Sequence, residues 1–390
     1  MFLLVVHSSH SGGVFRYLRG LIRTTNRTLR NNIMDTTKTK DDTAIAVQAD
    51  KLNAFVRTLA EKAGVSSEDS AILADSLVEA NLLGIDTHGV SRLPIYLKRI
   101  SLGLIDAKAK MTFKKNMPAV GVLDAHNGLG QVAGVRAMNE AVKLAKECGI
   151  GMAGVKNSQH FGAAGYYCTI ASKQGFIGMA FTNAEPALPP WGSYEAFFGT
   201  NPIAMSVPTR NDVPIVIDMS SSIVARGKIV AAARKGTPIP ADWALDPDGN
   251  PTTDAQKALD GSVLTMAGPK GYALALMVDI LSGVLTGGGS GKGVNSMYKD
   301  MAHPANVGHM LMAINPEAFM PREIFIERMQ NLVAGIKSLK KRPGTTEINY
   351  PGERKDRVKK TRKSSGITLD ESVVRELADL AKELNVEFKL

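Results

Sequence analysis

The stretch "NSQHFGAAGYY", residues 157–167, marks a junction between a strand and a helix. The apolar run "GIGMAGV" at 149–155 precedes it and has the length and composition of a buried strand, whereas "GYYCTIASKQ" at 165–174 follows with a helical pattern. His160 lies at the junction, and the residues after it are small. The pattern therefore predicts a strand–loop–helix unit that leaves space beside one imidazole.

Helices and strands alternate along the rest of the chain, but without a regular β-α-β rhythm. Amphipathic or apolar runs predict helices over 49–63, 66–84, 131–147, 268–285, 321–339 and from Thr368 onward. Short apolar runs predict strands over 119–125, 149–155, 175–182, 309–315 and, as a buried strand, 213–220. Pro and Gly predict irregular structure over 183–212 and mostly loop over 231–262. The fold class is therefore mixed α/β with discontinuous domains.

Two predicted helices begin with a capping box, in which a hydroxyl and an acid three residues apart cap the first turn. The boxes are Ser66-x-x-Asp69 and Thr368-x-x-Glu371. The helix after the second box has an apolar stripe at helical spacing, made of Val373, Leu377, Leu380 and Leu384.

The composition is that of an ordinary globular protein, with 390 residues, 44% of them hydrophobic and 22% charged. This length predicts two or more lobes rather than one small core. No apolar run approaches the roughly 20 residues that span a bilayer, so no membrane partner is expected. The two cysteines, Cys148 and Cys168, are too few for a disulfide framework and lack a zinc-like spacing, so no metal site is predicted.

The net charge of +10 is concentrated toward the two ends of the chain. Residues 1–34 hold five arginines and no acid, and residues 337–363 hold eleven Lys and Arg against three acids. A DNA-binding fold more often carries its charge on a folded face with a recognisable motif. We therefore interpret 337–363 as a solvated basic segment, an elaboration of the surface, and expect no nucleic-acid partner.

Residues 1–45 are predicted to be a targeting or disordered extension. The stretch "FRYLRGLIRTTNRTLRNN" at 15–32 is rich in Arg, lacks acids and spaces its apolar residues helically, as mitochondrial presequences do. The prediction is a mitochondrial location. The alternatives are a disordered extension, or a shorter cytoplasmic form that starts at Met34.

Two glycine-rich segments lack the context that a nucleotide site needs. "GLGQVA" at 128–133 fits G-x-G-x-x-A before a helix, but the next strand ends in Lys156-Asn157, where a Rossmann site has an acid for the ribose. "TGGGSGKG" at 286–293 has Thr286 and Gly293 where a phosphate loop needs Gly and Ser or Thr. We therefore interpret the first segment as a glycine-rich helix start and predict no Rossmann domain.

A second histidine segment, "GIDTHGVSRLP" at 84–94, holds Thr87, His88 and Arg92 close together. Arg can bind a carboxylate through two hydrogen bonds, and His titrates near neutral pH. A lone histidine is more often structural, but two of them beside Gly and polar residues at element ends favour a site. The residues alone indicate an enzyme that acts on a small acid.

Seven segments in order give the chain a resemblance to a known family. They are "ANLLGIDTHGVSRLPIYLKRI", "NSQHFGAAGYY", "FFGTNPIAMSVP", "VIDMSSSIVARGKI", "WALDPDGNPTTD", "GPKGYALALMVDILSGVLTG" and "YPGE". From about residue 48 onward the chain resembles the malate/L-lactate dehydrogenase family of the non-Rossmann type, which includes ureidoglycolate dehydrogenase, sulfolactate dehydrogenase and cyclic ketimine reductases. The resemblance implies the family's own NAD(P)-binding fold, with a helical substrate lobe at 46–125 together with 310–390 and a cofactor-binding lobe at 126–309.

The resemblance also implies roles for individual residues. His160 matches the family's proton acceptor, and Thr87, His88 and Arg92 match a substrate-side group in which Arg92 holds the carboxylate. The residues that match cofactor contacts are Ala184, Asp218, Met219, Ser220, Lys270 and Gly352. Thr87 departs from the family's usual Ser and adds a methyl group, which bears on the fit of the substrate.

The function implied by the resemblance is that of an NAD(P)-dependent oxidoreductase. It would transfer hydride between the nicotinamide of NAD or NADP and a small 2-hydroxy or 2-oxo acid that is malate- or lactate-like. Family members are similar in forming homodimers or larger assemblies with the active site near the interface, so a homodimer is expected. The alternatives are a cyclic imino acid (ketimine) reductase and, from another class, an inactive paralogue whose basic segment binds acidic partners or RNA.

Overall fold

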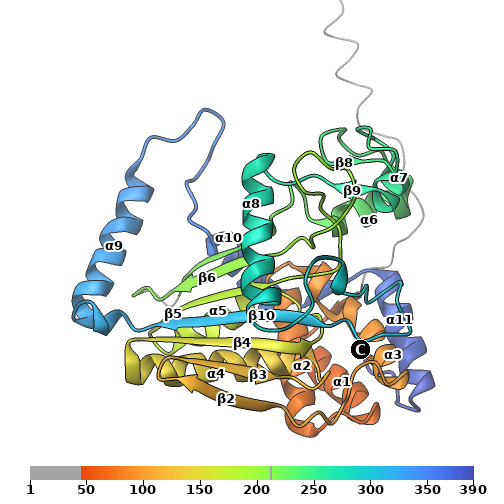
Figure 1. Cartoon of the computed structure of the whole chain (residues 1–390), viewed down its shortest axis with the longest axis horizontal. Coiled ribbons are helices and arrows are strands. Elements are labelled where there is room, and N and C mark those ends of the chain that lie inside the picture. The colour runs from red at the N-terminus through yellow and green to blue at the C-terminus, as the bar shows by residue number, and fades with distance from the viewer. Residues whose placement is uncertain (1–44, 211–212) are drawn as a thin grey trace, which may run out of the picture. The chain divides into compact units, whose positions relative to one another are not determined.

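A mixed sheet lies at the centre of the structure, a computed structural model that describes residues 45–210 and 213–390 (Figure 1). The strands in spatial order are β2 (Thr112–Met117), β3 (Val120–Asp124), β4 (Ile150–Ser158), β10 (Val307–Ile314), β5 (Ile177–Thr182), β6 (Ile203–Val207) and β7 (Ile215–Met219). Among these described strands, only β3 and β4 pair in parallel, and the other neighbours are antiparallel. The sheet therefore differs from the parallel sheet of a Rossmann domain. This agrees with the sequence analysis, which predicts no Rossmann domain.

Two helices, α4 (Gly130–Cys148) and α5 (Ala164–Lys173), pack on one face of this sheet. The side of α4 that is buried is rich in alanine. Small side chains let the helix lie close to β4, and a Cβ on Gly151 would stand only 2.0 Å from the carbonyl oxygen of Ala141. β4 and α5 confirm the strand–loop–helix unit predicted from residues 149–174, and α4 confirms the helix predicted at 131–147.

The other face of the sheet is covered in part by α8 (Pro269–Asp279) and the π-helical turn η3 (Ile280–Val284). The predicted helix at 268–285 is thus present, with a wider last turn. Apolar side chains on this side that stay exposed or half-buried are Met152, Met179, Met277, Ile280, Val284, Leu285 and Met312. This side of the structure therefore presents an apolar surface.

A helical layer joins the two ends of the described chain. It contains α1 (Ala49–Lys62), α2 (Ser67–Leu82), α3 (Leu93–Ser101), α11 (Glu371–Glu383) and a small sheet of β1 (Ile45–Val47) with β11 (Ile367–Leu369). These elements share one apolar core. The predicted lobe boundaries, after residues 125 and 309, stay a prediction. The central sheet contains β2 and β3, which precede the first boundary, and β10, which spans the second.

The two predicted capping boxes have different outcomes. Ser66 caps α2 as predicted, since its hydroxyl accepts a hydrogen bond from the backbone N–H of Asp69. The second box is wrong, because Thr368 lies in β11 and Asp370 stands at the N-cap of α11. The apolar stripe of that helix is confirmed, since all four of its residues belong to or pack against the core of the helical layer.

A third region contains α6 (Arg226–Lys235), α7 (Ala255–Asp260) and the short strands β8 (Ala244–Leu245) and β9 (Ser262–Val263). The irregular structure predicted over 183–212 is interrupted by β6, which the prediction missed. The prediction of mostly loop over 231–262 is confirmed, since α7, β8, the end of α6 and the start of β9 are the regular elements within it. Pro202 and Pro208 bracket the short apolar run of β6 and favour a loop locally, but pairing with strands on both sides overrides them.

The strand predicted at 213–220 is β7, but it is not buried. It lies at the edge of the sheet, and the side chain of Met219 is 43% exposed. An apolar run alone does not distinguish a central strand from an edge strand.

The C-terminal part contributes α9 (Arg322–Ser338) and α10 (Glu353–Ser365), and neither helix has a fully buried residue. Figure 1 shows α9 at the margin of the sheet, whereas α10 contacts α2. Single turns complete the structure: η1 (Asp86–His88), η2 (Val90–Arg92), η4 (Gly291–Gly293) and η5 (Pro316–Ala318). Within the part of the chain that the structure describes, no helix is both long and apolar enough to cross a membrane. Apart from Ile45, the predicted extension lies outside the described residues.

Candidate active site

The two histidines singled out in the sequence lie side by side. The rings of His88 and His160 are stacked, with centroids 5.7 Å apart and an angle of 28° between their planes. His88 ends η1, just after α2, whereas His160 follows β4. The fold thus joins two segments that are far apart along the chain.

Tyr96 holds His160 in place. Its hydroxyl oxygen lies 2.6 Å from Nδ1 of His160, and Tyr96 itself is only 1% exposed. Burial raises the pKa of Tyr96 to about 12, so the phenol stays protonated at neutral pH. Because Nδ1 is engaged, Nε2 is the nitrogen of His160 that can meet a substrate. The sequence prediction missed Tyr96, although it follows Arg92 by four residues in a helical stretch, a spacing that places both on one face.

Both imidazoles are neutral at pH 7. Burial, followed by the positive charges of Arg92 and Lys355, lowers the pKa of His88 to about 4. Burial, followed by His88 and Arg92, holds the pKa of His160 well below its usual range. A neutral imidazole can accept a proton, which is what a general base must do.

Arg92 and Thr87 complete the substrate-side group. Nε of Arg92 donates a hydrogen bond to the carbonyl oxygen of Thr87 at 2.6 Å, and Oγ1 of Thr87 lies 3.0 Å from Nδ1 of His88. Burial lowers the pKa of Arg92, but a guanidinium stays charged in proteins. Within residues 45–210 and 213–390, the side chain of Arg92 forms no other hydrogen bond or ion pair. Its two terminal nitrogens can therefore bind a carboxylate.

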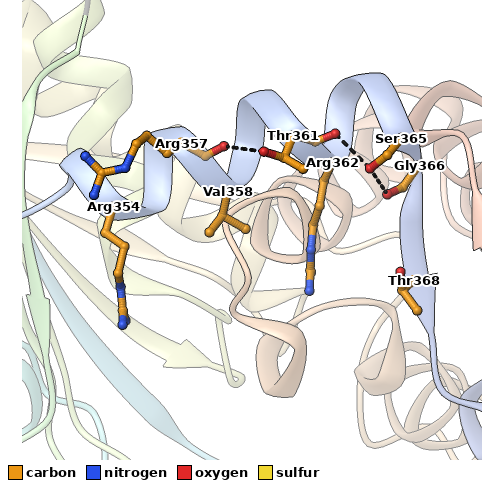
Figure 2. A pocket seen from close by; sticks show the side chains of 8 residues that line it. All are labelled: Arg354, Arg357, Val358, Thr361, Arg362, Ser365, Gly366 and Thr368. Atoms are coloured by element: carbon orange, nitrogen blue, oxygen red, sulfur yellow. Dashed lines mark hydrogen bonds between the residues drawn. The ribbon is translucent and has the colours of Figure 1, made fainter.

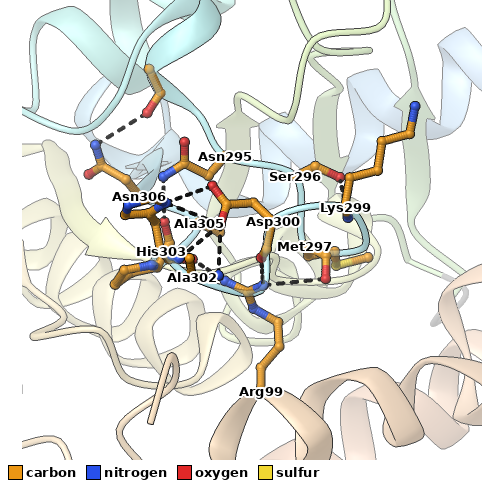
Figure 3. A network of polar contacts seen from close by, with 12 residues as sticks. Arg99, Asn295, Ser296, Met297, Lys299, Asp300, Ala302, His303, Ala305 and Asn306 are labelled. Carbon is orange, nitrogen blue, oxygen red and sulfur yellow. Dashed lines mark hydrogen bonds and ion pairs between the residues drawn. The ribbon is translucent and has the colours of Figure 1, made fainter. Parts of the chain in front are cut away.

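A buried arginine, Arg99, fixes the segment 295–306 (Figure 3). Arg99 is 1% exposed and donates to the carbonyl oxygens of Asp300 and His303, at 2.7 Å each. In the segment held this way, the ring of Tyr298 has its centroid 5.3 Å from Cζ of Arg92, within range of a cation–π interaction. The sequence prediction missed both Arg99 and Tyr298, since nothing in their local pattern shows that the arginine is buried.

The glycine-rich segment at 128–133 serves the same site by close packing. Gly130 begins α4, and a Cβ there would stand 2.3 Å from the carbonyl oxygen of Gln159 and 2.6 Å from that of His160. Only a glycine allows α4 to approach the histidine loop so closely. The interpretation as a glycine-rich helix start is therefore confirmed.

The predicted cofactor residues gather around the end of β7. Asp218 lies against the first turn of α5, where a Cβ on Gly165 would stand 2.9 Å from Oδ2 of Asp218. Burial raises the pKa of Asp218, and Lys355, whose Nζ lies 3.9 Å away, opposes that shift. Asp218 therefore lies against the helix that follows the loop of His160, and Met219 and Ser220 come directly after it along the chain.

The remaining cofactor residues reach the same place through backbone contacts. The N–H of Ala184 donates to Oδ1 of Asn201 at 3.2 Å, and the carbonyl oxygen of Asn201 accepts from Oγ of Ser221 at 2.7 Å. Lys270 is exposed in the first turn of α8, beside Gly271, where a Cβ would stand 2.9 Å from the carbonyl oxygen of Ser221.

Gly352 reaches β7 from the other side. It has a φ of +102°, and a Cβ there would stand 2.9 Å from the backbone nitrogen of Val216. That nitrogen donates a hydrogen bond to Pro351 at 2.9 Å. A side chain at position 352 would therefore break both the backbone conformation and this contact.

The donor set at the end of β7 fits a dinucleotide. A carboxylate such as Asp218 can accept hydrogen bonds from ribose hydroxyls. The ammonium of Lys270, at the start of a helix, suits a phosphate. Asp218 and Lys270 thus have the chemistry that NAD or NADP needs, and the cofactor roles of the six residues stay a prediction.

The start of α6 closes the site near Thr87. A Cβ on Gly227 would stand 2.8 Å from the methyl carbon Cγ2 of Thr87. The preceding residue, Arg226, forms an ion pair with Glu185 at 2.8 Å. The methyl group by which Thr87 differs from the family's usual Ser therefore packs on a glycine, which the sequence alone did not reveal.

The basic segment at 337–363 lies on the surface, as interpreted, but it is not a free tail. Part of it forms α10, and three basic side chains of α10 pair with acids of the site region: Lys355 with Asp218, Lys359 with Glu79 and Arg362 with Asp86. Lys355, Lys359 and Arg362 follow the i, i+4, i+7 spacing of one helix face. This spacing was the available signal, but the count of charges hid it.

Comparison with known proteins assigns the chain to a class of enzyme. Residues 47–378 match the family model described as "Malate/L-lactate dehydrogenase". The malate dehydrogenase of Pyrococcus horikoshii is 39% identical, over 89% of this chain and 98% of that protein. The L-sulfolactate dehydrogenase of Methanocaldococcus jannaschii is 41% identical, over 84% of this chain and 94% of that protein. The chain belongs to the malate/L-lactate dehydrogenase family and is a hydroxyacid dehydrogenase of that family, as the sequence predicted.

Solved structures agree with this assignment. The sulfolactate dehydrogenase from M. jannaschii superposes with a TM-score of 0.82 at 39% identity, covering 88% of this chain and 98% of that one. A Δ1-piperideine-2-carboxylate reductase from Pseudomonas syringae superposes with a TM-score of 0.78 at 29% identity, covering 86% and 100%. The predicted family fold is confirmed.

Relatives named for a cofactor include both dinucleotides. Ureidoglycolate dehydrogenase (NAD(+)) of Escherichia coli is 33% identical, over 85% of this chain and 94% of that protein. The (2R)-3-sulfolactate dehydrogenase (NADP(+)) of Chromohalobacter salexigens is 36% identical, over 81% and 92%. The family thus contains NAD- and NADP-dependent dehydrogenases.

Proposed function

We propose that the protein transfers hydride between NAD or NADP and a small 2-hydroxy or 2-oxo acid that is malate- or lactate-like. The observation that carries this proposal is the cluster of two neutral imidazoles, His88 and His160, beside a guanidinium, Arg92. A base and a carboxylate anchor are what oxidation of a 2-hydroxy acid requires. The sulfolactate and malate dehydrogenases among its relatives support a substrate of this kind.

His160 acts as the base in this proposal. In the tautomer that leaves Nε2 as an acceptor, Nδ1–H donates to the hydroxyl oxygen of Tyr96. Nε2 then takes the proton of the substrate hydroxyl, and in the reverse direction returns it to the forming alkoxide. A positioned general base contributes about 10²- to 10⁴-fold to the rate.

Arg92 orients the substrate. Its terminal nitrogens bind the carboxylate through two hydrogen bonds, so that the carbon bearing the hydroxyl group faces the cofactor. Asp218 and Lys270 hold the dinucleotide, with Ala184, Met219, Ser220 and Gly352 beside them. The nicotinamide supplies the hydride acceptor.

A ketimine reductase is the second candidate. The likeness to a Δ1-piperideine-2-carboxylate reductase favours it, because a cyclic imine that carries a carboxylate suits the same arginine and the same proton donor. The difference lies in the reduced bond, which is C=N in place of C=O.

A substrate panel tests both candidates. The purified chain is given 2-oxo acids and cyclic imino acids with NADH and with NADPH, and the loss of absorbance at the nicotinamide band is followed. We expect turnover with at least one 2-oxo acid that carries a small or acidic side chain. Turnover only with imines would select the second candidate, and no turnover with any substrate, from a folded protein, would reject both.

The active protein is a homodimer in this proposal. The apolar surface formed by α8, η3 and the half-buried methionines of the sheet supports it, since a surface of this kind marks a contact site. Val284 and Leu285 are more than half exposed, at 64% and 61%. Light scattering of the wild-type protein should give twice the mass of one chain. The double variant Val284→Asp with Leu285→Asp should give the mass of a single chain. A monomeric wild type would contradict the assignment.

The location proposed for the protein is the mitochondrion, with the cytoplasm as the alternative. The arginine-rich, acid-free stretch at 15–32 supports it. Fusing residues 1–45 to a fluorescent protein and sequencing the mature N-terminus would decide. A diffuse cytoplasmic signal without cleavage would contradict the mitochondrial prediction.

A further inference from the structure

We infer that Arg362 is a positioning residue for the substrate loop, residues 83–92, and that it acts through Asp86. The inference rests on the proposed function, because it concerns how the loop presents His88 and Arg92 to an acid substrate. Arg362 lies in α10, in the segment that the charge pattern alone assigned to a solvated tail.

The guanidinium of Arg362 makes a bidentate contact with the carboxylate of Asp86. Nη1 of Arg362 lies 2.6 Å from Oδ1 of Asp86, and Nη2 lies 3.0 Å from Oδ2. Nη1 also donates to the carbonyl oxygen of Asn81, near the end of α2, at 2.5 Å. One guanidinium therefore ties the first residue of η1 to the helix that precedes the loop.

Asn81 passes this constraint along the loop. It is buried, donates through Nδ2 to Oδ1 of Asp86 at 2.7 Å and accepts through Oδ1 from the N–H of Val90 at 2.9 Å. The loop approaches it so closely that a Cβ on Gly89 would stand 2.1 Å from Oδ1 of Asn81. Asp86 and Val90 flank Thr87 and His88, so both anchors border the residues of the site.

α10 faces the loop along one side (Figure 2). Figure 2 shows Arg362 and Val358 extending from the same side of the helix, with Arg357 directed elsewhere. Val358 lies near the start of the loop, where a Cβ on Gly84 would stand 3.2 Å from Cγ1 of Val358. One turn closer to the helix start, Lys355 is the residue beside Asp218. α10 therefore spans from the cofactor strand to the substrate loop.

The pair matters for geometry more than for stability. The side chain of Asp86 is 48% exposed and that of Arg362 is 22% exposed. Exposed ion pairs contribute little to folding, because solvent and salt screen them. Without Arg362, Asn81 still bonds Asp86 and Val90, so the protein keeps its fold while the loop loses its outer restraint.

The test compares two arginines of α10, Arg362 and Arg357, each of which contacts both oxygens of one carboxylate. Arg362→Met removes the fork on Asp86, whereas Arg357→Met removes a fork on Glu347, with distances of 2.6 and 3.1 Å, outside the substrate loop. We expect Arg362→Met to raise KM for the 2-oxo acid about 10- to 100-fold, with kcat changed less than about threefold and the Kd of NAD(P)H unchanged, because small displacements of an orienting group have effects of this size. Arg357→Met should match the wild type.

Further variants keep the result decisive. Arg362→Lys keeps the charge but not the fork, so most of the KM defect should remain. Asp86→Asn and Arg362→Met act through one contact, so the double variant should be no worse than the more impaired single variant. Additive losses, a KM for Arg362→Met equal to that for Arg357→Met, or an equal rise in the Kd of the cofactor would overturn the inference.

Hydrogen exchange tests the inference without turnover. The N–H of His88 donates to Ile85 at 2.9 Å and that of Arg92 donates to Gly89 at 3.0 Å. Amides of residues 83–92 should exchange faster in Arg362→Met than in Arg357→Met. Equal exchange would overturn the positioning role, whereas a wild type that turns over no acid would contradict only the proposed function.

Discussion

The hydroxyl oxygen of Tyr96 lies 2.6 Å from Nδ1 of His160, so the imidazole and the phenol form one unit. A base whose far nitrogen is fixed by a third group is held in one tautomer and one orientation. Burial, followed by the stacked ring of His88 and the cation of Arg92, lowers the pKa of the same imidazole and keeps it neutral. The unit is therefore set to receive a proton at Nε2 at physiological pH.

Replacing the base should remove the chemical step and leave cofactor binding intact. We expect His160→Asn to lower kcat about 10²- to 10⁴-fold, because Asn cannot accept the proton. Fluorescence titration with NADH or NADPH should give a Kd close to that of the wild type. His126→Asn is the matched control, since His126 is half exposed after β3. Turnover near the wild-type level in folded His160→Asn would remove His160 from the chemistry.

Replacing the guanidinium of Arg92 by an ammonium should weaken binding of the acid substrate. Arg92→Lys keeps the charge but loses the planar pair of donors, so KM for the acid should rise about 10- to 100-fold. Arg375→Lys is the control, because Arg375 is 72% exposed and pairs with Glu371 within α11. Steady-state kinetics on the acid and the cofactor separate the effects, and an unchanged acid KM would rule out Arg92 as the anchor.

The contact between Thr87 and Gly227 should make the effect of a substitution at position 227 on KM depend on the residue at position 87. Gly227→Ala places a methyl group 2.8 Å from Cγ2 of Thr87, and overpacking of this kind costs about 1–3 kcal/mol. KM for the acid should rise in Gly227→Ala and recover in Gly227→Ala with Thr87→Ser, which removes the opposing methyl group. Kinetics and denaturant unfolding of the four proteins check this. A double variant as impaired as Gly227→Ala would show that the clash is not with Thr87.

Acid should destabilise the fold through His309. Its Nδ1 lies 2.7 Å from Oγ1 of Thr182 and its Nε2 lies 2.8 Å from Oγ of Ser158, and burial lowers its pKa to about 3. Because the folded pKa lies below the unfolded value of about 6.5, the unfolded chain binds the proton first. The free energy of unfolding should therefore fall between pH 6.5 and 3, by up to about 1.4 kcal/mol per pH unit from this group.

The measurement for His309 is a set of urea midpoints at pH 7, 6 and 5. His309→Gln removes the titrating group and keeps side-chain hydrogen bonding, so its stability should fall less steeply with acid than that of the wild type. Parallel curves for the two proteins would exclude His309 as a source of the pH dependence.

Much of the fold follows from local pattern. The strand–loop–helix unit around His160, the Ser66 cap and the glycine at position 130 are short-range features, and each was predicted from the residues nearby. The failures depend on distant partners. β6 becomes a strand because strands pair with it on both sides, and Thr368 cannot cap a helix because it pairs with β1.

The site divides in the same way. His160, His88 and Arg92 carry chemistry that marks them in the sequence. Tyr96 and Arg99 are buried side chains that hold parts of the site in place. Arg362 acts through Asp86, which lies far from it along the chain. The spacing of the basic residues marks one face of the helix of Arg362, but no local pattern shows which acids that face meets, so charge counting assigned the helix to solvent.

The helical layer has a consequence for the order of folding during synthesis. α1 and α2 leave the ribosome long before β11 and α11, which close their apolar core. Contacts between such distant segments form slowly, and a core made of early and late segments stays open until the late segments are made. The newly made N-terminal helices therefore wait with an uncovered apolar face, which is the kind of surface that chaperones bind.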